Sequence, residues 1–418
     1  MKEIILQMSF LNWSVAPEGS TPTQRENFRK VIIDGIGIGI EGAAAPFLPV
    51  FLARLGATNF QVGLLTAMPA AAGFMFAILI GAFLQTRKQV VPWFSGARLM
   101  VISAYAITGL LPFVLPNDQI VVATLIIWAL VTVPQVIVNV CFSVVMNGVA
   151  GPKGRYELMS RRWSILGATT AISVALAGQI LDRIAPPFNY QVVFLVFSIG
   201  GLISYYYSSR IELPDQVPPP RVPGQSLRER FTSFTGLIRG QRAFVSFMSK
   251  RFVFFTGSAL SVPIFPLYYV REVHASDAWI GIINTAQAGI LLFGYFIWLR
   301  FSKTRGSRFV LLWTTFGLAL YPALTAFTHD VELITIIAAL AGIFQAGLDL
   351  VFFDELLKTF PAQYSATFVS FAQSLQHFAT ITAPLVGTLL ADHIGLSGAL
   401  LVSTGIRFIA FLMFLRDK

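Results

Sequence analysis

The chain has 418 residues, of which 55% are hydrophobic and only 12% carry a charge. An ordinary soluble domain has about 25% charged residues, so this composition excludes a soluble globular protein and predicts an integral membrane protein. The net charge of +10 does not indicate nucleic-acid binding, because the basic residues gather in short gaps between apolar spans and form no aromatic-interleaved patch. The single cysteine excludes an internal disulfide and a thiolate metal cluster.

Residues 1–28 contain neither a sustained apolar run nor a small-residue cleavage site, so we expect a cytosolic segment and no cleaved signal peptide. Beyond them, apolar runs of about 20 residues, punctuated by Gly, Pro and charge, predict an all-α membrane protein with twelve spanning helices. The expected spans are 29–52, 60–84, 90–115, 119–148, 162–184, 190–209, 243–270, 278–299, 308–328, 331–353, 365–391 and 396–415.

The first span is the most informative, because it carries two carboxylates, Asp34 and Glu41, inside an apolar run. A carboxylate at mid-bilayer costs roughly 2.5 to 3.5 kcal/mol, so it is kept only where it faces protein or water. The two acids share one helix face. At 1.5 Å per residue from the expected cytosolic edge, Asp34 lies about 7 Å deep and Glu41 about 18 Å deep, near the midplane.

Two interpretations of Glu41 remain open: a proton or substrate-cation site, or an acid bound to neighbouring hydroxyls or amides for packing. Asp34 is shallower, and Arg98 in the third span reaches a similar depth, so a structural Asp34 to Arg98 ion pair is one expectation. Gly35 and Gly39 form a smooth ridge that lets another helix approach closely. The G-x-G-x-x-G spacing in this span does not follow a strand and therefore predicts no nucleotide cofactor.

The second half presents a similar problem at Asp349, which lies about eight residues from the cytosolic end of the tenth span. Its candidate partners are Arg251 in the seventh span and Arg407 in the twelfth. A buried charge without a partner is costly, so we expect one of these arginines to contact Asp349. Such a pair could be a gate between moving halves or a plain structural bridge.

Uncharged polar side chains recur in the fourth, eighth, tenth and eleventh spans. They are Gln135, Asn139, Asn284, Gln287, Gln345, Gln373 and His377. Converging amides orient a substrate in a cavity, but they also join helices to one another, and both interpretations stay open. The four histidines are scattered, and no HExxH, GxSxG or phosphate-binding lysine loop is present, so we expect no metal site, no cofactor and no enzyme activity.

A proline-rich connector, residues 210–241, divides the spans into two halves of six, 29–209 and 242–418. Its second part, SLRERFTSFTGLIRG, predicts an interfacial helix on the inner leaflet, with a partner-protein helix as the alternative. A shift of 217 residues superposes APFLPVFL on VPIFPLYY, and a shift of 209 superposes Gly178 on Gly387. Two related halves leave one central cavity between them, which rocking exposes to each side in turn.

Basic residues gather in the loops after spans 2, 4 and 8, whereas the opposite loops are poor in base, so both termini are expected in the cytosol. With its two six-helix halves, a basic loop after span 2 that reads GAFLQTRK from Gly81 to Lys88, and a charged connector, the chain resembles the major facilitator superfamily over residues 28–415. The resemblance implies that spans 1, 4, 7 and 10 line the central cavity.

The same resemblance implies a function: secondary active transport of a small organic solute by alternating access, with proton coupling through Glu41 as an option. The expected setting is the plasma or inner membrane, crossed many times by a monomer. The alternative is a transporter-like sensor or scaffold without net transport. Such a protein would usually add a soluble domain, and none of the loops is long enough to fold one.

Overall fold

The computed structural model describes residues 20–85, 87–185, 188–215, 240–359 and 365–416. Within these ranges every regular element is helical. The elements are α2 (Pro22–Glu41), the 3₁₀ turn η1 (Gly42–Ala44), α3 (Phe47–Arg54), α4 (Asn59–Gln85), α5 (Val91–Val114), α6 (Asn117–Arg183), α7 (Phe188–Ser208), α9 (Arg242–Ser261), α10 (Ile264–Arg271), α11 (Asp277–Arg305), α12 (Ser307–Ala326), α13 (Val331–Lys358) and α14 (Ser365–Leu415).

Eleven of the described helical stretches are long and apolar enough to cross a membrane, against the twelve that the sequence predicts. The difference arises at α14, which counts as one stretch although two helices meet inside it at Gly395. Gly395 has a φ of 77° and a ψ of 166°, a conformation that glycine adopts without steric cost. This break falls between the expected spans 365–391 and 396–415.

Two expected boundaries in the first half need correction. Helix α2 begins at Pro22 rather than at residue 29, because Thr21 and Gln24 form a reciprocal capping box at its start. Helix α6 continues through residues 149–161, where Gly151, Pro152 and Gly154 predicted a loop. Helix propensity is a weak prior that tertiary context overrides, and the two apolar stretches within α6 still correspond to the expected spans.

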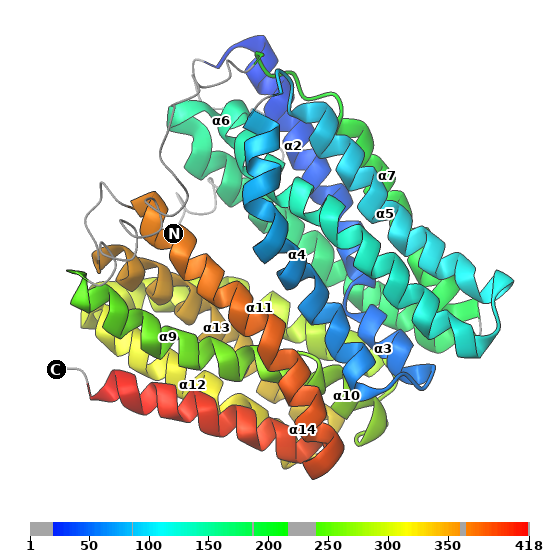
Figure 1. Ribbon diagram of the computed structural model, residues 1–418, viewed down its shortest axis with the longest axis vertical. Coiled ribbons are helices and arrows are strands. Elements are labelled where there is room, and N and C mark those ends of the chain that lie inside the picture. Colours follow the sequence, from blue (N-terminus) through cyan, green and yellow to red (C-terminus); the bar gives the residue numbers. More distant parts are fainter. Residues whose placement is uncertain (1–19, 86, 186–187, 216–239, 360–364, 417–418) are drawn as a thin grey trace, which may run out of the picture.

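The helices form two bundles, one of α2 to α7 and one of α9 to α14 (Figure 1). Contacts between the bundles join α4 to α14, α6 to α11, and α3 to α10. In Figure 1 the bundles meet at the end where α3 and α10 lie and spread apart toward the opposite end. Gly178 of α6 lies against Gly281 of α11, where a Cβ added at Gly178 would lie only 3.2 Å from Gly281 Cα.

Large apolar side chains cover the outside of both bundles, as a lipid environment requires. Val114, Leu130, Phe293, Phe296 and Phe327 are each more than 60% exposed. A soluble monomer rarely exposes apolar surface on this scale, whereas hydrocarbon solvates it without penalty. The exposed surface therefore agrees with the composition in indicating a multi-pass membrane protein.

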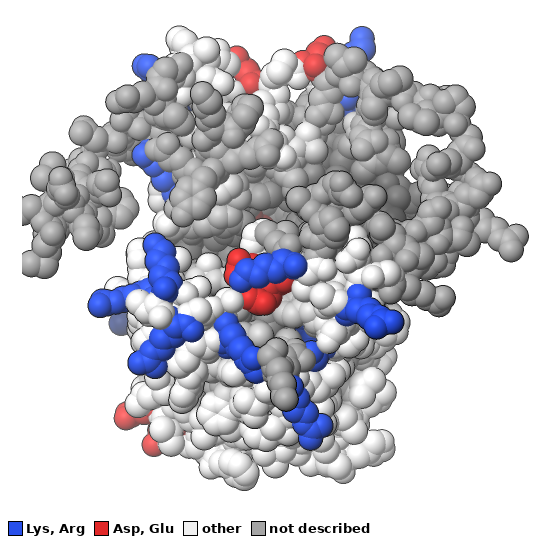
Figure 2. All heavy atoms as spheres, turned by 90° about the vertical axis from the view of Figure 1, so that its left-hand side faces the viewer, with Lys and Arg blue, Asp and Glu red and all other residues white. Residues whose placement is uncertain are grey.

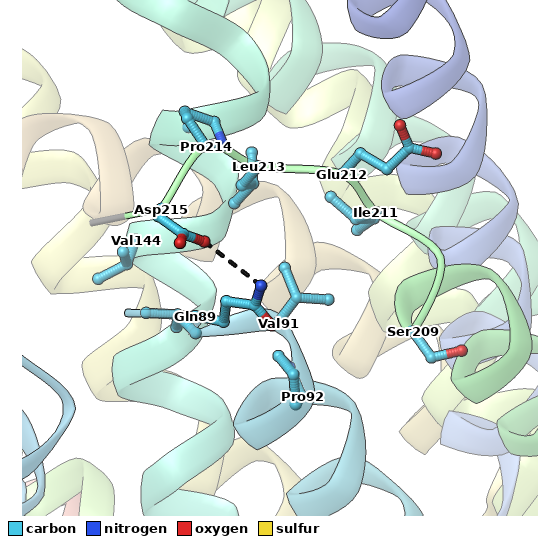
Figure 3. A pocket seen from close by; sticks show the side chains of 12 residues that line it. Gln89, Val91, Pro92, Val144, Ser209, Ile211, Glu212, Leu213, Pro214 and Asp215 are labelled. Atoms are coloured by element: carbon cyan, nitrogen blue, oxygen red, sulfur yellow. Dashed lines mark hydrogen bonds between the residues drawn. The ribbon is translucent and has the colours of Figure 1, made fainter. Parts of the chain in front are cut away.

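The segment after α7 folds back onto the first bundle. The Asn27 amide donates to Glu212 O at 2.7 Å and accepts from Glu212 N at 3.0 Å, while Lys30 Nζ donates to Arg210 O at 2.7 Å. Gln89 donates to Asp215 across a hollow of about 430 Å³ (Figure 3). The start of the expected connector thus packs on the first bundle, and the expected interfacial helix lies outside the described residues.

Candidate functional site

A cavity of about 370 Å³ enters the first bundle between α2, α5 and α6. Four of the predicted site residues line it: Glu41 from α2, Arg98 from α5, and Gln135 and Asn139 from the first part of α6. Gln135 Nε2 lies 3.4 Å from Asn139 Oδ1, as expected for amides four residues apart on one helix face. The structure therefore brings together a carboxyl, a guanidinium and two amides that are far apart in the sequence.

Glu41 is the last residue of α2, at the point where the helix tightens into η1. Its side chain packs against α7, because a Cβ added at Gly201 would lie 3.1 Å from Glu41 Oε2. The residue is 5% exposed, and no other described residue forms a hydrogen bond with its carboxyl group. The packing interpretation expects hydroxyl or amide partners here, and the described residues supply none; a proton or solute site at Glu41 stays a prediction.

Asp34 lies one level along the same helix face and is completely buried. Its Oδ1 accepts hydrogen bonds from Arg98 Nη1 and, at 2.7 Å, from Ser204 Oγ. Its Oδ2 accepts from Arg162 Nη2 at 3.0 Å. The predicted ion pair with Arg98 is thus present, and it belongs to a larger cluster that joins α2, α5, α6 and α7.

Arg162 is the member of this cluster that the sequence analysis missed. The expected span 162–184 begins at this arginine, which was counted with the basic residues of the loop after span 4, yet it lies within α6 and is only 3% exposed. The glycine ridge of α2 is the signal that could have found it. A Cβ at Gly35 would lie 3.2 Å from Arg162 Cγ, and one at Gly39 would lie 2.8 Å from Thr169 Cβ. The ridge therefore receives the second part of α6, as predicted for an unnamed helix.

We expect Gly39→Ala to destabilise the protein by roughly 1 to 3 kcal/mol, because the added methyl group overlaps Thr169 in a packed contact. The matched control is Gly167→Ala on α6, where an added Cβ meets no atom within 4 Å and helix propensity improves. Apparent melting temperatures of the two variants in detergent measure the difference. Equal melting temperatures would show that the ridge is not tightly packed.

The predicted charges of the second half are arranged differently from the expectation. Asp349 is exposed and accepts from Gln345 Nε2 at 2.7 Å and from Tyr295 OH at 3.2 Å. Arg407 donates to Leu318 O at 2.9 Å. The prediction that Arg251 or Arg407 contacts Asp349 is wrong in this structure, because α13 presents Asp349 to α11 while Arg407 points to α9 and α12.

Arg251, the other expected partner of Asp349, contacts aromatic rings instead. Its guanidinium lies over the rings of Phe255 and Phe352, 5.0 and 5.6 Å from their centroids. Its Nε and Nη1 have no hydrogen-bond partner among the described residues. The ring faces stabilise the cation in place of a carboxylate.

The remaining predicted residues do not gather at one place. The Asn284 side chain donates to Ile280 O of its own helix, and the backbone carbonyl of Gln287 packs against Gly342. His377 lies against Gly73 where α14 meets α4, and the side chain of Gln373 is exposed. These four residues line no part of the cavity beside Glu41.

A second polar cluster, which we call the end latch, joins the two bundles near α3 and α10. Arg54 at the end of α3 donates to Asp277 Oδ1 at 3.1 Å and to Ala275 O at 2.6 Å. Arg271 at the end of α10 donates to Asn59 Oδ1 at 2.6 Å. Arg54 and Asp277, and likewise Asn59 and Arg271, come from different bundles, so both contacts hold the bundles together.

The two contacts of the end latch are related by the internal repeat. Arg271 follows Arg54 by 217 residues, and Asp277 follows Asn59 by 218. Each half thus supplies an arginine where its first crossing ends and a polar acceptor where its second begins. Both arginines fall just beyond the expected spans 29–52 and 243–270, in the loops that are poor in base, and the sequence analysis did not pair them, although the repeat at 217 to 218 residues was the available signal.

Comparisons with known proteins agree with this architecture. A family model described as Major Facilitator Superfamily matches residues 248–418. A mutant of the nucleoside transporter NupG superposes with a TM-score of 0.71 at 11% identity, covering 93% of this chain and 99% of that chain. A bacterial homologue of the iron transporter ferroportin in an inward-facing state gives 0.70 at 15% identity, covering 94% and 97%. No curated protein matches the chain.

A POT family transporter in complex with a thioalcohol-conjugated peptide gives a TM-score of 0.68 at 13% identity, covering 96% of this chain and 98% of that chain. Likeness at such low identity shows a shared fold. The solutes named for these transporters differ from one another, so the fold does not select among them.

Proposed function

The chain belongs to the major facilitator superfamily, and from this membership we infer that it carries a small organic solute across the plasma or inner membrane by alternating access. The two parts of α14, separated at Gly395, then cross separately and complete twelve spans. The two moving units are the halves 29–209 and 242–418, and the cavity beside Glu41 belongs to the first of them. The observation that carries the proposal is the cavity in the first bundle, where the buried Glu41 carboxyl has no hydrogen-bond partner among the described residues and meets polar groups from α5 and α6.

The distribution of charge supports an orientation. Figure 2 shows Lys and Arg side chains gathered at the end of the second bundle that lies away from α10. Exposed basic residues at the junction of α11 and α12 are Arg300, Lys303, Arg305 and Arg308. By the positive-inside rule this end faces the cytosol, together with both termini, and the end latch faces outward.

With this orientation the structure corresponds to an inward-facing state. The bundles are joined at the outer end by the contacts of Arg54 and Arg271, and they spread apart toward the cytosol (Figure 1). Alternating access requires the complementary state, in which the outer contacts separate and the cytosolic ends close. A solute bound beside Glu41 would then reach either side of the membrane in turn.

Glu41 is the group through which we propose that protons drive transport. An ionised carboxyl is costly to bury without a counter-charge, whereas the protonated form is not. Water entering the cavity favours release of the proton, and closure of the cavity favours its retention. A carboxyl that is open only to the cavity therefore follows the conformational cycle.

The test uses purified protein in proteoliposomes, with a solute chosen by a thermal-shift screen, since ligands that bind only the native state stabilise it. We expect a pH gradient to drive accumulation by the wild type. Glu41→Gln should abolish this accumulation, because it cannot release a proton, and should leave solute exchange intact. The matched control is Glu332→Gln, which changes an exposed carboxyl in the first turn of α13.

Accumulation by Glu41→Gln at the wild-type level would exclude Glu41 as the coupling group. Failure of the wild type to take up any solute that stabilises it would favour the sensor or scaffold alternative. The two results are independent, because the first compares variants and the second needs only the wild type.

A further inference from the structure

The cavity beside Glu41 holds an unusual set of charges, which bears on the kind of solute that it accepts. Two guanidiniums, Arg98 and Arg162, line it together with the Glu41 carboxyl. Both arginines share one buried counter-ion, Asp34. Resting on the function proposed above, we infer that the solute is an organic anion with an apolar body, and that it binds together with a proton on Glu41.

The first support is a pair of uncommitted donors. Arg98 Nη1 and Arg162 Nη2 donate hydrogen bonds to the Asp34 carboxylate. The other terminal nitrogens, Arg98 Nη2 and Arg162 Nη1, form no hydrogen bond with any described residue, although the arginines are only 4% and 3% exposed. Guanidinium nitrogens at a cavity wall bind carboxylate or phosphate oxygens with charge-assisted hydrogen bonds. An anion in the cavity would supply the missing acceptors.

The second support is the balance of charge. With Glu41 ionised, the two arginines are matched by two carboxylates, and the cluster is neutral. With Glu41 protonated, the cluster carries one positive charge that only a bound anion can neutralise. Proton and anion therefore favour each other's binding, and thermodynamic linkage makes this effect equal in both directions. A cation would meet two guanidiniums at the same place and would be repelled.

The described charged and titratable groups around the cavity agree with this count of charges. Helix α2 contributes Asp34, α5 contributes Arg98 and the neutral Tyr105, and α6 contributes Arg162. Helix α7 presents Gly201 and Ser204, and neither carries a charge. No further described charge lines the cavity, so the excess positive charge is not cancelled by another carboxylate.

The shape and chemistry of the walls narrow the class of anion. Phe142 and Trp163 lie beside Arg162, whose guanidinium carbon is 4.8 and 5.8 Å from their ring centroids. On α6, Gln135 and Asn139 add amide donors and acceptors. Aromatic walls with few polar groups favour a ligand with a flat apolar body and one charged end. Aromatic or short aliphatic monocarboxylates fit this description.

The experiment compares three probes of one shape, benzoate, benzamide and benzylamine, which are anionic, neutral and cationic. Each is added to the purified full-length protein, and the shift in melting temperature gives its affinity. We expect stabilisation by benzoate alone. Its affinity should weaken by up to about tenfold per pH unit as Glu41 loses its proton. In Glu41→Gln the affinity for benzoate should no longer depend on pH, whereas Glu332→Gln should behave as the wild type.

Several outcomes would overturn the inference. Greater stabilisation by benzylamine than by benzoate would indicate a cation site at Glu41. Equal stabilisation by benzamide and benzoate would indicate that the site does not discriminate between ligands by charge. Stabilisation by none of the three, nor by acetate, a sulfonate or a phosphate ester, would also exclude an anion site. The proposed transport would still stand if a pH gradient drove uptake of another solute. Benzoate binding without uptake of any solute would support the anion site and contradict the proposed transport.

Discussion

Replacing Asp34 with Asn is expected to destabilise the protein by about 3 to 5 kcal/mol. The change keeps the shape of the side chain but leaves the guanidiniums of Arg98 and Arg162 buried together without a counter-ion. Ser204 loses an ionised acceptor at the same time. The apparent melting temperature in detergent should fall by roughly 10 °C or more.

The cluster around Asp34 also predicts strong coupling between its members. The double variant Asp34→Asn with Arg162→Gln should be more stable than the sum of the two single effects implies, because it removes one of the two unpaired cations. Additive losses would show that Asp34 and Arg162 do not interact. The control pair Glu332→Gln with Arg300→Gln, both exposed, should show effects near zero.

The second large effect is expected at the end latch. Removing both arginines, Arg54→Ala with Arg271→Ala, deletes the hydrogen bonds through which these side chains join the bundles in the described part of the chain. If each half-buried arm contributes about 1 kcal/mol, the pair shifts the balance of states by about 2 kcal/mol. This corresponds to a roughly thirtyfold change in favour of the outward-open state.

Accessibility of an introduced cysteine measures this shift. Ala278, which is 9% exposed, packs beneath the latch, with its backbone N–H donating to Asp182 of the other bundle. In a background where the buried Cys141 is replaced by alanine, Ala278→Cys should react slowly with a membrane-impermeant maleimide added outside. The double arginine variant should react much faster. Unchanged labelling would mean that the latch does not hold the outer end closed.

Much of the fold could be predicted because its signals are local. Apolar run length locates membrane spans, and the proline-rich stretch separates the two groups of helices. The close approach at Gly39 could also be predicted, because a glycine ridge has no other obvious use in a spanning helix. The lining of the cavity could be predicted in part. Glu41, Gln135 and Asn139 line the same cavity, and their roles in transport stay predictions.

The rest of the site depends on the direction in which each side chain points from its helix axis. The expected depth of a residue in the membrane does not give this direction. Asp349 and Arg407 lie at comparable expected depths but point to different neighbours, so depth alone paired them wrongly. Arg162 stands at the first position of the expected span 162–184 and was counted with the basic loop after span 4. Only the packing of α6 on α2 shows that it faces inward.

The hydrogen bonds between Asn27, Lys30 and the segment after α7 have a consequence for how the protein moves. They connect the first turns of α2 to the segment that leaves α7, and the hydrogen bond from Ser204 to Asp34 connects the same two helices deeper in the bundle. Because α2 and α7 are joined at two depths, the first bundle should move as a rigid body rather than by sliding of single helices. Strain from transport would then concentrate where α4 meets α14 and α6 meets α11.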